Sequence, residues 1–404
     1  MSSDRKDLSP GGAKQAAVLP FVIHTFLVYF SIALPLAVLP IFVKTQLGLS
    51  AVMAGLAISI QYISTVVSRA QVGRMTDVLG PKRTSFLGFL FMLLAAAFTL
   101  GTAFLTKWPW TAYGVLAISR LALGIAESMV ATTAITWVIA RAGPNQSVKA
   151  MSWNGIATYG ALALGAPVGV ALTSLWGLPA IAAVTGAIGL LGLYLTWIKQ
   201  DARLPKAPAH ARTGFWQVLK AVTPYGLALG LAATGFGVLT AFITLLYADR
   251  HWPGAAFAVS AFGLSFVGVR LGLTRAIRRF GGLPIALAAM VIEFIGLVAI
   301  WMAGAPQFAL VGAALTGFGF GPLFPSLGRD VMAQAPPDAQ GAALGLYCVF
   351  PDAALGAAGP MAGFLIGRFG YSAPFALGAG AVAGAFAITA WIMKEQRSAS
   401  AATR

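Results

Sequence analysis

Charged residues are scarce in this chain. Only 9% of its 404 residues are Asp, Glu, Lys or Arg, whereas 58% are hydrophobic. Soluble domains carry roughly 25% charged residues, so a water-soluble protein of this length would lack the charges to cover its surface. The shortage excludes a soluble protein and favours helices packed against one another and against lipid.

Cysteine and histidine are also scarce, and this limits the chemistry. The single cysteine, Cys348, excludes an intrachain disulfide, and the 3 histidines are too few for a His-rich metal site. The sequence lacks the phosphate-binding pattern GxxxxGK[ST] and the hydrolase pattern GxSxG. We therefore expect no metal, no cofactor and no enzymatic activity.

Acidic residues are the rarer charge, 11 against 27 basic residues, which gives a net charge of +16. Nucleic-acid binders concentrate such an excess on one soluble face. Here Lys and Arg fall in short clusters between long apolar runs. Nucleic acid is therefore not an expected partner.

Long apolar runs fill most of the chain. A helix needs about 20 mostly apolar residues to cross a bilayer. The first run is too long for the core of a signal peptide and is expected to stay in the protein. The twelve runs are about 18–43, 51–72, 84–106, 111–140, 153–175, 179–199, 220–247, 255–275, 284–303, 308–333, 341–366 and 374–393. The sequence thus predicts an all-α membrane protein with twelve transmembrane helices.

The basic residues predict the orientation, because cytoplasmic loops carry an excess of Lys and Arg. With the N-terminus in the cytoplasm, the inside segments and helix ends hold 22 of the 27 basic residues. The outside holds four, and Arg120 lies within a span. We therefore expect both termini to be cytoplasmic.

A polar stretch between runs six and seven divides the chain into halves. The expected units are a cytoplasmic tail over 1–17, a six-helix bundle over 18–199, a cytoplasmic linker over 200–219, a second six-helix bundle over 220–393 and a cytoplasmic tail over 394–404. A shift of 193 residues relates parts of the two halves and indicates an internal repeat. The matched pairs are Gly124 and Gly317, Pro144 and Pro337, Pro167 and Pro360, and Gly177 and Gly370.

The loop between runs two and three carries the strongest pattern, GRMTDVLGPKR. Gly80 permits a tight turn and Gly73 close helix packing, whereas Asp77 places a negative charge on the cytoplasmic rim. In the matching loop of the second half, Arg278 stands where the acid is expected. The residues of this gating motif are Gly73, Arg74, Asp77, Gly80, Lys82 and Arg83.

This order of Gly, Asp, Gly and basic residues resembles the cytoplasmic loop signature of the major facilitator superfamily. The similarity covers essentially the whole chain. Segments such as MSWNG at 151–155 and GFGV at 235–238 are similar to a bacterial branch of permeases grouped with sugar and drug efflux proteins. The resemblance implies two pseudo-symmetric six-helix bundles in a bacterial inner membrane, which rock around a central site.

Ionisable groups inside a membrane are costly and usually face a cavity or a partner. Arg120 and Glu127 are seven residues apart, hence on one face of a helix but about 10 Å apart along its axis, too far for a direct ion pair. Their segment resembles a family motif associated with proton coupling. We expect Arg120, Glu127 and Asp352 to serve that coupling and Glu293 to be a structural hydrogen-bonding group. Structural pairing with another helix is the alternative for each residue.

Small residues and prolines in two spans resemble a motif of drug/proton antiporters. Such residues let helices approach closely and bend. In the first copy Ala166 and Val170 stand where glycines are expected, so generic close packing explains the pattern almost as well. The residues are Gly165, Pro167, Gly169, Gly359, Pro360 and Gly363.

We therefore expect a secondary active transporter that exports a small organic solute, such as a sugar or a drug-like compound, in exchange for protons. The alternatives are a proton-driven importer of a small metabolite and a non-transporting membrane sensor. Few charges and many Phe, Tyr and Gly in the cavity-lining spans favour neutral or amphiphilic solutes. Substrate contacts are expected at Gln61, Asn154 and Tyr159, with interhelical hydrogen bonding as the equal alternative. A monomer is expected.

Overall fold

The computed structural model describes residues 19–142, 147–202, 215–335 and 340–402, and every regular element in them is a helix. Prolines break the first span into α2 (Leu19–Leu36), α3 (Leu39–Ile41) and the π-helical turn η1 (Phe42–Gln46). The other helices are α4 (Ala51–Leu79), α5 (Pro81–Phe104), α6 (Pro109–Ala142), α7 (Ser147–Trp176), α8 (Leu178–Ile198), α9 (Phe215–Asp249), α10 (Ala255–Phe280), α11 (Gly282–Trp301), α12 (Pro306–Phe320), α13 (Leu323–Gln334), α14 (Gln340–Phe369) and α15 (Ala373–Ala402).

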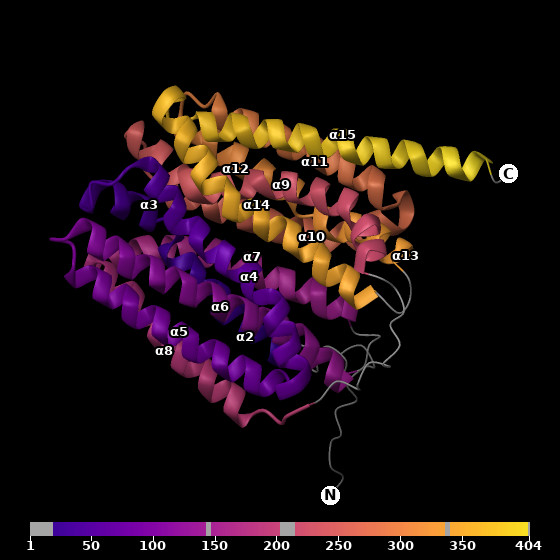
Figure 1. Ribbon diagram of the computed structural model, residues 1–404. Coiled ribbons are helices and arrows are strands. Elements are labelled where there is room, and N and C mark those ends of the chain that lie inside the picture. The colour runs from indigo at the N-terminus through magenta and orange to yellow at the C-terminus, as the bar shows by residue number, and fades with distance from the viewer. Residues whose placement is uncertain (1–18, 143–146, 203–214, 336–339, 403–404) are drawn as a thin grey trace, which may run out of the picture.

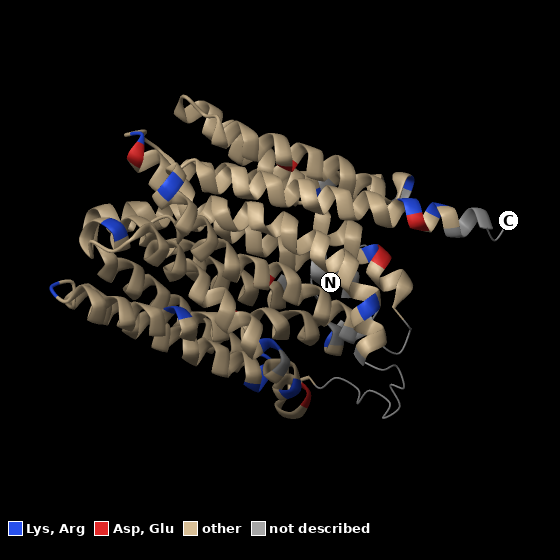
Figure 2. Cartoon of the chain, turned by 45° about the horizontal axis from the view of Figure 1, so that its top comes forward, with Lys and Arg blue, Asp and Glu red and all other residues tan. Residues whose placement is uncertain are grey.

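The described helices account for all twelve predicted runs. Eleven stretches are long and apolar enough to cross a membrane, and a twelfth apolar helix, Ala255–Arg270, is shorter. The predicted twelve-helix membrane protein is therefore confirmed. Lys, Arg, Asp and Glu gather mainly at the two ends of the helices, as Figure 2 shows. We call the end that carries the turn between α4 and α5 the motif rim.

The helix ends differ from the prediction in two places. Helix α9 begins at Phe215, so that the last residues of the predicted linker are helical; 203–214 and the predicted tail 1–17 lie outside the described residues. Helix α15 continues to Ala402 and projects beyond the neighbouring helices (Figure 1). The predicted tail 394–404 is thus largely an extension of the last helix, because Lys, Glu, Gln and Ala are good helix formers.

The helices form two groups, α2–α8 and α9–α15, which lie side by side in Figure 1. Within the first group α5 packs along α6 and α8, and within the second α9 packs along α14 and α15. The groups meet mainly along two helix pairs: α4 with α14, and α7 with α10. The residues that face each other across these two pairs determine how the groups hold together.

Glycines bring α4 and α14 into backbone contact. A Cβ atom on Gly55 would lie 2.5 Å from the carbonyl oxygen of Gly359, and one on Gly363 would lie 2.7 Å from the Cα of Val52. Ser59 accepts a hydrogen bond from the Gly359 amide at 3.2 Å. Substitution of these glycines would therefore push the two groups apart.

The matching stretch of α7 packs differently. Gly165 and Gly169 leave no room for a Cβ beside Ala33 and Leu34 of α2, which belongs to the same group. The glycines of α7 thus sit one position away from those of α14 in the repeat and face a helix of their own group. Ala166 and Val170 stand at the positions that correspond to Gly359 and Gly363 in the repeat.

Candidate functional site

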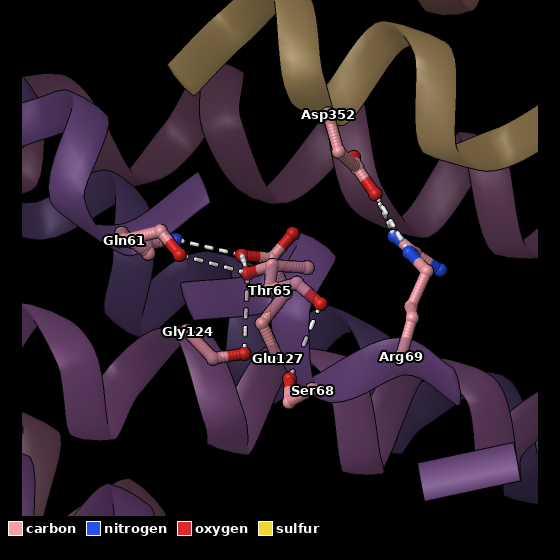
Figure 3. A network of polar contacts seen from close by, with 7 residues as sticks. All are labelled: Gln61, Thr65, Ser68, Arg69, Gly124, Glu127 and Asp352. Carbon is pink, nitrogen blue, oxygen red and sulfur yellow. Dashed lines mark hydrogen bonds and ion pairs between the residues drawn. The ribbon is translucent and has the colours of Figure 1, made fainter. Parts of the chain in front are cut away.

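Glu127 lies at the centre of the first group of helices. It is 1% exposed on α6, and its Oε2 accepts hydrogen bonds from Gln61 Nε2 at 2.8 Å and Thr65 Oγ1 at 3.2 Å, both from α4 (Figure 3). Gly124 makes this contact possible, because a Cβ there would overlap the Gln61 backbone. A buried carboxyl with two neutral donors can exchange a proton without losing its hydrogen-bonding neighbours.

Arg120 reaches the same carboxyl through Gln61. Its Nη2 donates to Gln61 Oε1, while the amide of Gln61 donates to Glu127. Within the described chain Arg120 and Glu127 form no direct ion pair, as their separation along the helix predicts. The side chain of Gln61 is fully buried and engaged at both ends. Gln61 therefore makes the interhelical hydrogen bonds that were the alternative to a substrate contact. A substrate contact by Gln61 stays a prediction.

Asp352 joins the two groups of helices. Its Oδ2 lies 2.5 Å from Nη2 and 2.7 Å from Nε of Arg69, so that α14 is tied to α4 by an ion pair (Figure 3). It is the one ion pair between side chains in the described residues. Sequence reasoning missed Arg69, because it stands close to the predicted end of its span among the basic residues of the rim.

Of the other two predicted substrate contacts, Asn154 bonds within the first group and Tyr159 faces the second. The hydroxyl of Thr25 on α2 donates to Asn154 on α7. Tyr159 stacks on Phe266 of α10 with 3.5 Å between ring centroids. Neither contact tests substrate binding, but only Tyr159 is placed where the two groups meet.

Aromatic side chains from the second group surround Tyr159. The rings of Phe236 and Phe262 stack at 4.9 Å, and Phe320 lies 6.3 Å from Tyr159. Together with Phe266 they form what we call the aromatic cluster: Tyr159, Phe236, Phe262, Phe266 and Phe320. No periodic pattern in the sequence predicts this cluster, because its members come from four helices far apart along the chain.

The gating motif covers the end of α4, the turn at Gly80 and the start of α5. Gly80 has φ +83°, which favours glycine, and Pro81 starts α5. Lys82 Nζ donates to the carbonyl oxygens of Trp197 and Lys199 at the end of α8. Burial lowers the pKa of the Lys199 ammonium to about 8.

The structure changes one expectation for this motif. Close packing at Gly73 is wrong: a Cβ there would meet open space. Asp77 is exposed, as are Arg74 and Arg83, and in the described chain it pairs with no basic residue. The side chain of Arg278 lies outside the described residues. Asp77 is thus available for a contact that forms in another conformation.

The comparisons with known proteins identify the family of this chain. The model of the Major Facilitator Superfamily matches residues 21–360. The chain belongs to the major facilitator superfamily. An uncharacterized MFS-type transporter of Burkholderia mallei (strain SAVP1) is 44% identical over 98% of each chain. Another, from Pseudomonas aeruginosa (strain LESB58), is 42% identical over 94% of each chain.

Solved transporters of the superfamily share the fold. The crystal structure of a mutant of the nucleoside transporter NupG has a TM-score of 0.71 and 16% identity, and covers 93% of this chain and 99% of its own. The human organic anion transporter MFSD10 has a TM-score of 0.69 and 17% identity, and covers 95% and 100%. The chain is therefore a multi-pass membrane transporter of the superfamily, and its two groups of helices correspond to the expected pseudo-symmetric bundles.

Glu293 departs from its predicted role in this transporter fold. It is completely buried on α11, beside Gly235 and Gly319, yet neither carboxyl oxygen has a hydrogen-bond partner in the described chain. The prediction of a structural hydrogen-bonding group is therefore wrong for the described chain, in which the two glycines let neighbouring helices pack closely against Glu293. An ionised carboxyl would be very costly there.

We expect Glu293→Gln to keep the fold and to unfold at a temperature equal to or above that of the wild-type protein. The amide is nearly isosteric and carries no charge to bury. Thermal unfolding in detergent measures this, with Glu395→Gln on exposed α15 as the matched control. A clear loss of stability in Glu293→Gln alone would show that the carboxylate has a stabilising partner.

Proposed function

We propose that this transporter couples the movement of a small organic solute to protons, and that it exports the solute in exchange for protons entering the cell. One observation carries the proposal. A carboxyl that ties the bundles together, Asp352, lies in the same polar region as a second buried carboxyl, Glu127. Protonation of Asp352 would remove the charge that holds Arg69 and so favour separation of α4 from α14.

Glu127 is the carboxyl we assign to proton uptake during the cycle. It belongs to one bundle only, so its protonation changes the charge beside the interface without breaking a contact between bundles. Arg120 is linked to this carboxyl only through Gln61. The bundles, 18–199 and 220–393, would rock around a central site, in the inner membrane with both termini cytoplasmic.

The solved relatives are consistent with a small organic solute, since they are a nucleoside and an organic anion transporter by their descriptions. The direct test uses proteoliposomes with an entrapped pH dye and a series of sugars, nucleosides, carboxylates and cationic dyes. A solute exchanged for protons moves protons opposite to itself. Proton movement with the solute would instead indicate import, and no proton movement with any transported solute would refute the coupling.

We also propose that Asp77 stabilises the outward-open state. The N-terminus of α14, at Gln340, carries about half a positive charge, and an acid that approaches it gains ~0.3–1 kcal/mol. Loss of that contact should shift a balanced two-state equilibrium about two- to fivefold toward the inward-open state.

The measurement is labelling of a single reporter cysteine at Gly345 after Cys348→Ser. Gly345 is exposed on the face of α14 that also carries Asp352. Labelling from the cytoplasmic side should increase in Asp77→Asn and stay unchanged in Arg278→Ala. Equal labelling in Asp77→Asn and wild type, with abundant folded protein, would rule out this role.

A further inference from the structure

Arg270 is a second arginine at the junction of the bundles, but no acidic side chain of the described chain forms an ion pair with it. It lies on α10 and faces α7 of the other bundle at Gly155, where a Cβ would overlap its Nη1 atom. Its Nε donates to the carbonyl oxygen of Gly321 at 3.2 Å, and the guanidinium lies 4.5 Å above the ring of Phe266. No carboxylate of the described chain lies within ion-pair distance of it.

The internal repeat shows what is missing beside Arg270. Arg69 and Arg270 each stand eleven residues before the glycine that ends their helix, Gly80 and Gly281. Asp352 stands eight residues before Pro360, and in the first half the residue eight before Pro167 is Tyr159. Arg69 is neutralised across the bundles by Asp352. Arg270 faces Tyr159 at the corresponding place.

An unpaired guanidinium in this setting is costly, because it lies within the span among aromatic rings. In the described chain two ionisable side chains lie close to it, Tyr159 and Tyr347, and neither tyrosine is an anion at neutral pH. The Gly321 carbonyl occupies only Nε. In the part of the chain that the structure describes, the two terminal nitrogens have no acceptor, and a planar carboxylate matches their geometry.

We propose that Arg270 binds the carboxylate of the transported solute, and that the aromatic cluster receives its apolar or aromatic body. This assignment rests on the proposed function and narrows its substrate to monovalent organic carboxylates. Among the described residues no second unpaired cation lies beside Arg270, which suits a single negative charge and not a phosphate dianion. In the conformation described here Tyr159 stacks on Phe266 and closes the space, so the site would open when α7 and α10 move apart.

The sequence favoured neutral or amphiphilic solutes, because the spans expected to line the cavity hold few charges. Arg270 lies on α10, outside that set of spans, and stands next to the basic residues of the rim. An amphiphilic carboxylate fits both the low charge of the spans and the presence of Arg270. Its apolar part would pack against the aromatic rings, and its carboxylate would pair with the arginine.

The experiment is equilibrium binding of radiolabelled phenylacetate to the purified full-length protein, with no gradient. We expect saturable binding that unlabelled benzoate displaces and that benzamide and benzyl alcohol, which are uncharged, do not. Arg270→Gln should weaken binding about tenfold or more. Arg270→Lys should weaken it by less, because lysine keeps the positive charge but lacks the two parallel N–H donors of the guanidinium. Arg250→Gln, on an exposed arginine at the opposite rim, should bind as wild type.

A second variant protects the test against misfolding of Arg270→Gln. Tyr159→Asp places an internal carboxylate where Asp352 stands in the repeat, and it should abolish phenylacetate binding although Arg270 is intact. Absence of binding to the wild type, binding unchanged in Arg270→Gln or in Tyr159→Asp, or equal displacement by benzamide would each overturn the proposal. This binding experiment does not measure proton movement. A transporter that is not coupled to protons could therefore still bind phenylacetate at Arg270. Likewise, a transporter that does not bind phenylacetate could still be coupled to protons.

Discussion

Glu127→Gln is expected to abolish uphill transport driven by a pH gradient while solute exchange between the two sides of the membrane continues. The amide cannot carry the proton, but it can still accept a hydrogen bond from Gln61 or Thr65 and fills the same space on α6. Exchange requires only that the loaded transporter changes conformation. Uphill transport requires a proton to bind and leave in each cycle, so its loss should be nearly complete.

Two measurements on the same proteoliposomes separate these effects: accumulation under a pH gradient, and exchange of labelled against unlabelled solute without one. Glu395→Gln, an exposed acid near the end of α15, is the matched control and should behave as wild type in both. Normal gradient-driven accumulation in Glu127→Gln would remove Glu127 from the coupling. Loss of exchange as well would point to a structural role for its hydrogen bonds.

The spans could be predicted from the sequence because lipid imposes a length and a polarity on each helix separately. The same holds for the shared face of Arg120 and Glu127, which follows from helical geometry alone. Neither rule says which helix lies opposite. The bridge through Gln61 therefore could not be derived, although Gln61 was singled out as a substrate contact with interhelical hydrogen bonding as the alternative.

The remaining contacts could not be predicted because they depend on which helices pack against each other. Arg69 and Asp352 are 283 residues apart, and nothing in their local patterns links them. Glu293 was expected to find a hydrogen-bond partner, but its neighbours were not known. Gly73 was expected to pack closely because it belongs to the motif, whereas the crowded glycines are Gly55 and Gly359. Such contacts depend on the shapes of two surfaces, which a single helix does not reveal.

Breaking the ion pair between Arg69 and Asp352 is expected to shift the conformational equilibrium about tenfold toward states in which α4 and α14 separate at the motif rim. A charged hydrogen bond contributes roughly 1.5–3 kcal/mol. Because 22% and 12% of the two side chains remain exposed, the lower end applies. Asp352→Asn keeps the shape of the carboxyl and removes its charge, so it mimics the protonated state in the proposed cycle.

Spin labels at Val78 and Gly345, in a Cys348→Ser background, report the separation of α4 and α14, since both positions are exposed near the motif rim. The distance distribution should move to longer values in Asp352→Asn and in Arg69→Gln. The exchanged pair, Arg69→Asp with Asp352→Arg, should restore the wild-type distribution. Arg279→Gln, an exposed arginine at the end of α10 and outside the gating motif, serves as the control.

The exchanged pair also separates conformational coupling from proton coupling. Its charges attract as in the wild type, but the acid now stands on α4 and the arginine on α14. If the ion pair only holds the bundles together, the exchanged protein should transport with the wild-type dependence on pH. If Asp352 itself takes up the proton from the central site, that dependence should change although the distances are restored. Unchanged distances in Asp352→Asn would show that the glycine contact at Gly55 and Gly359 alone holds the bundles.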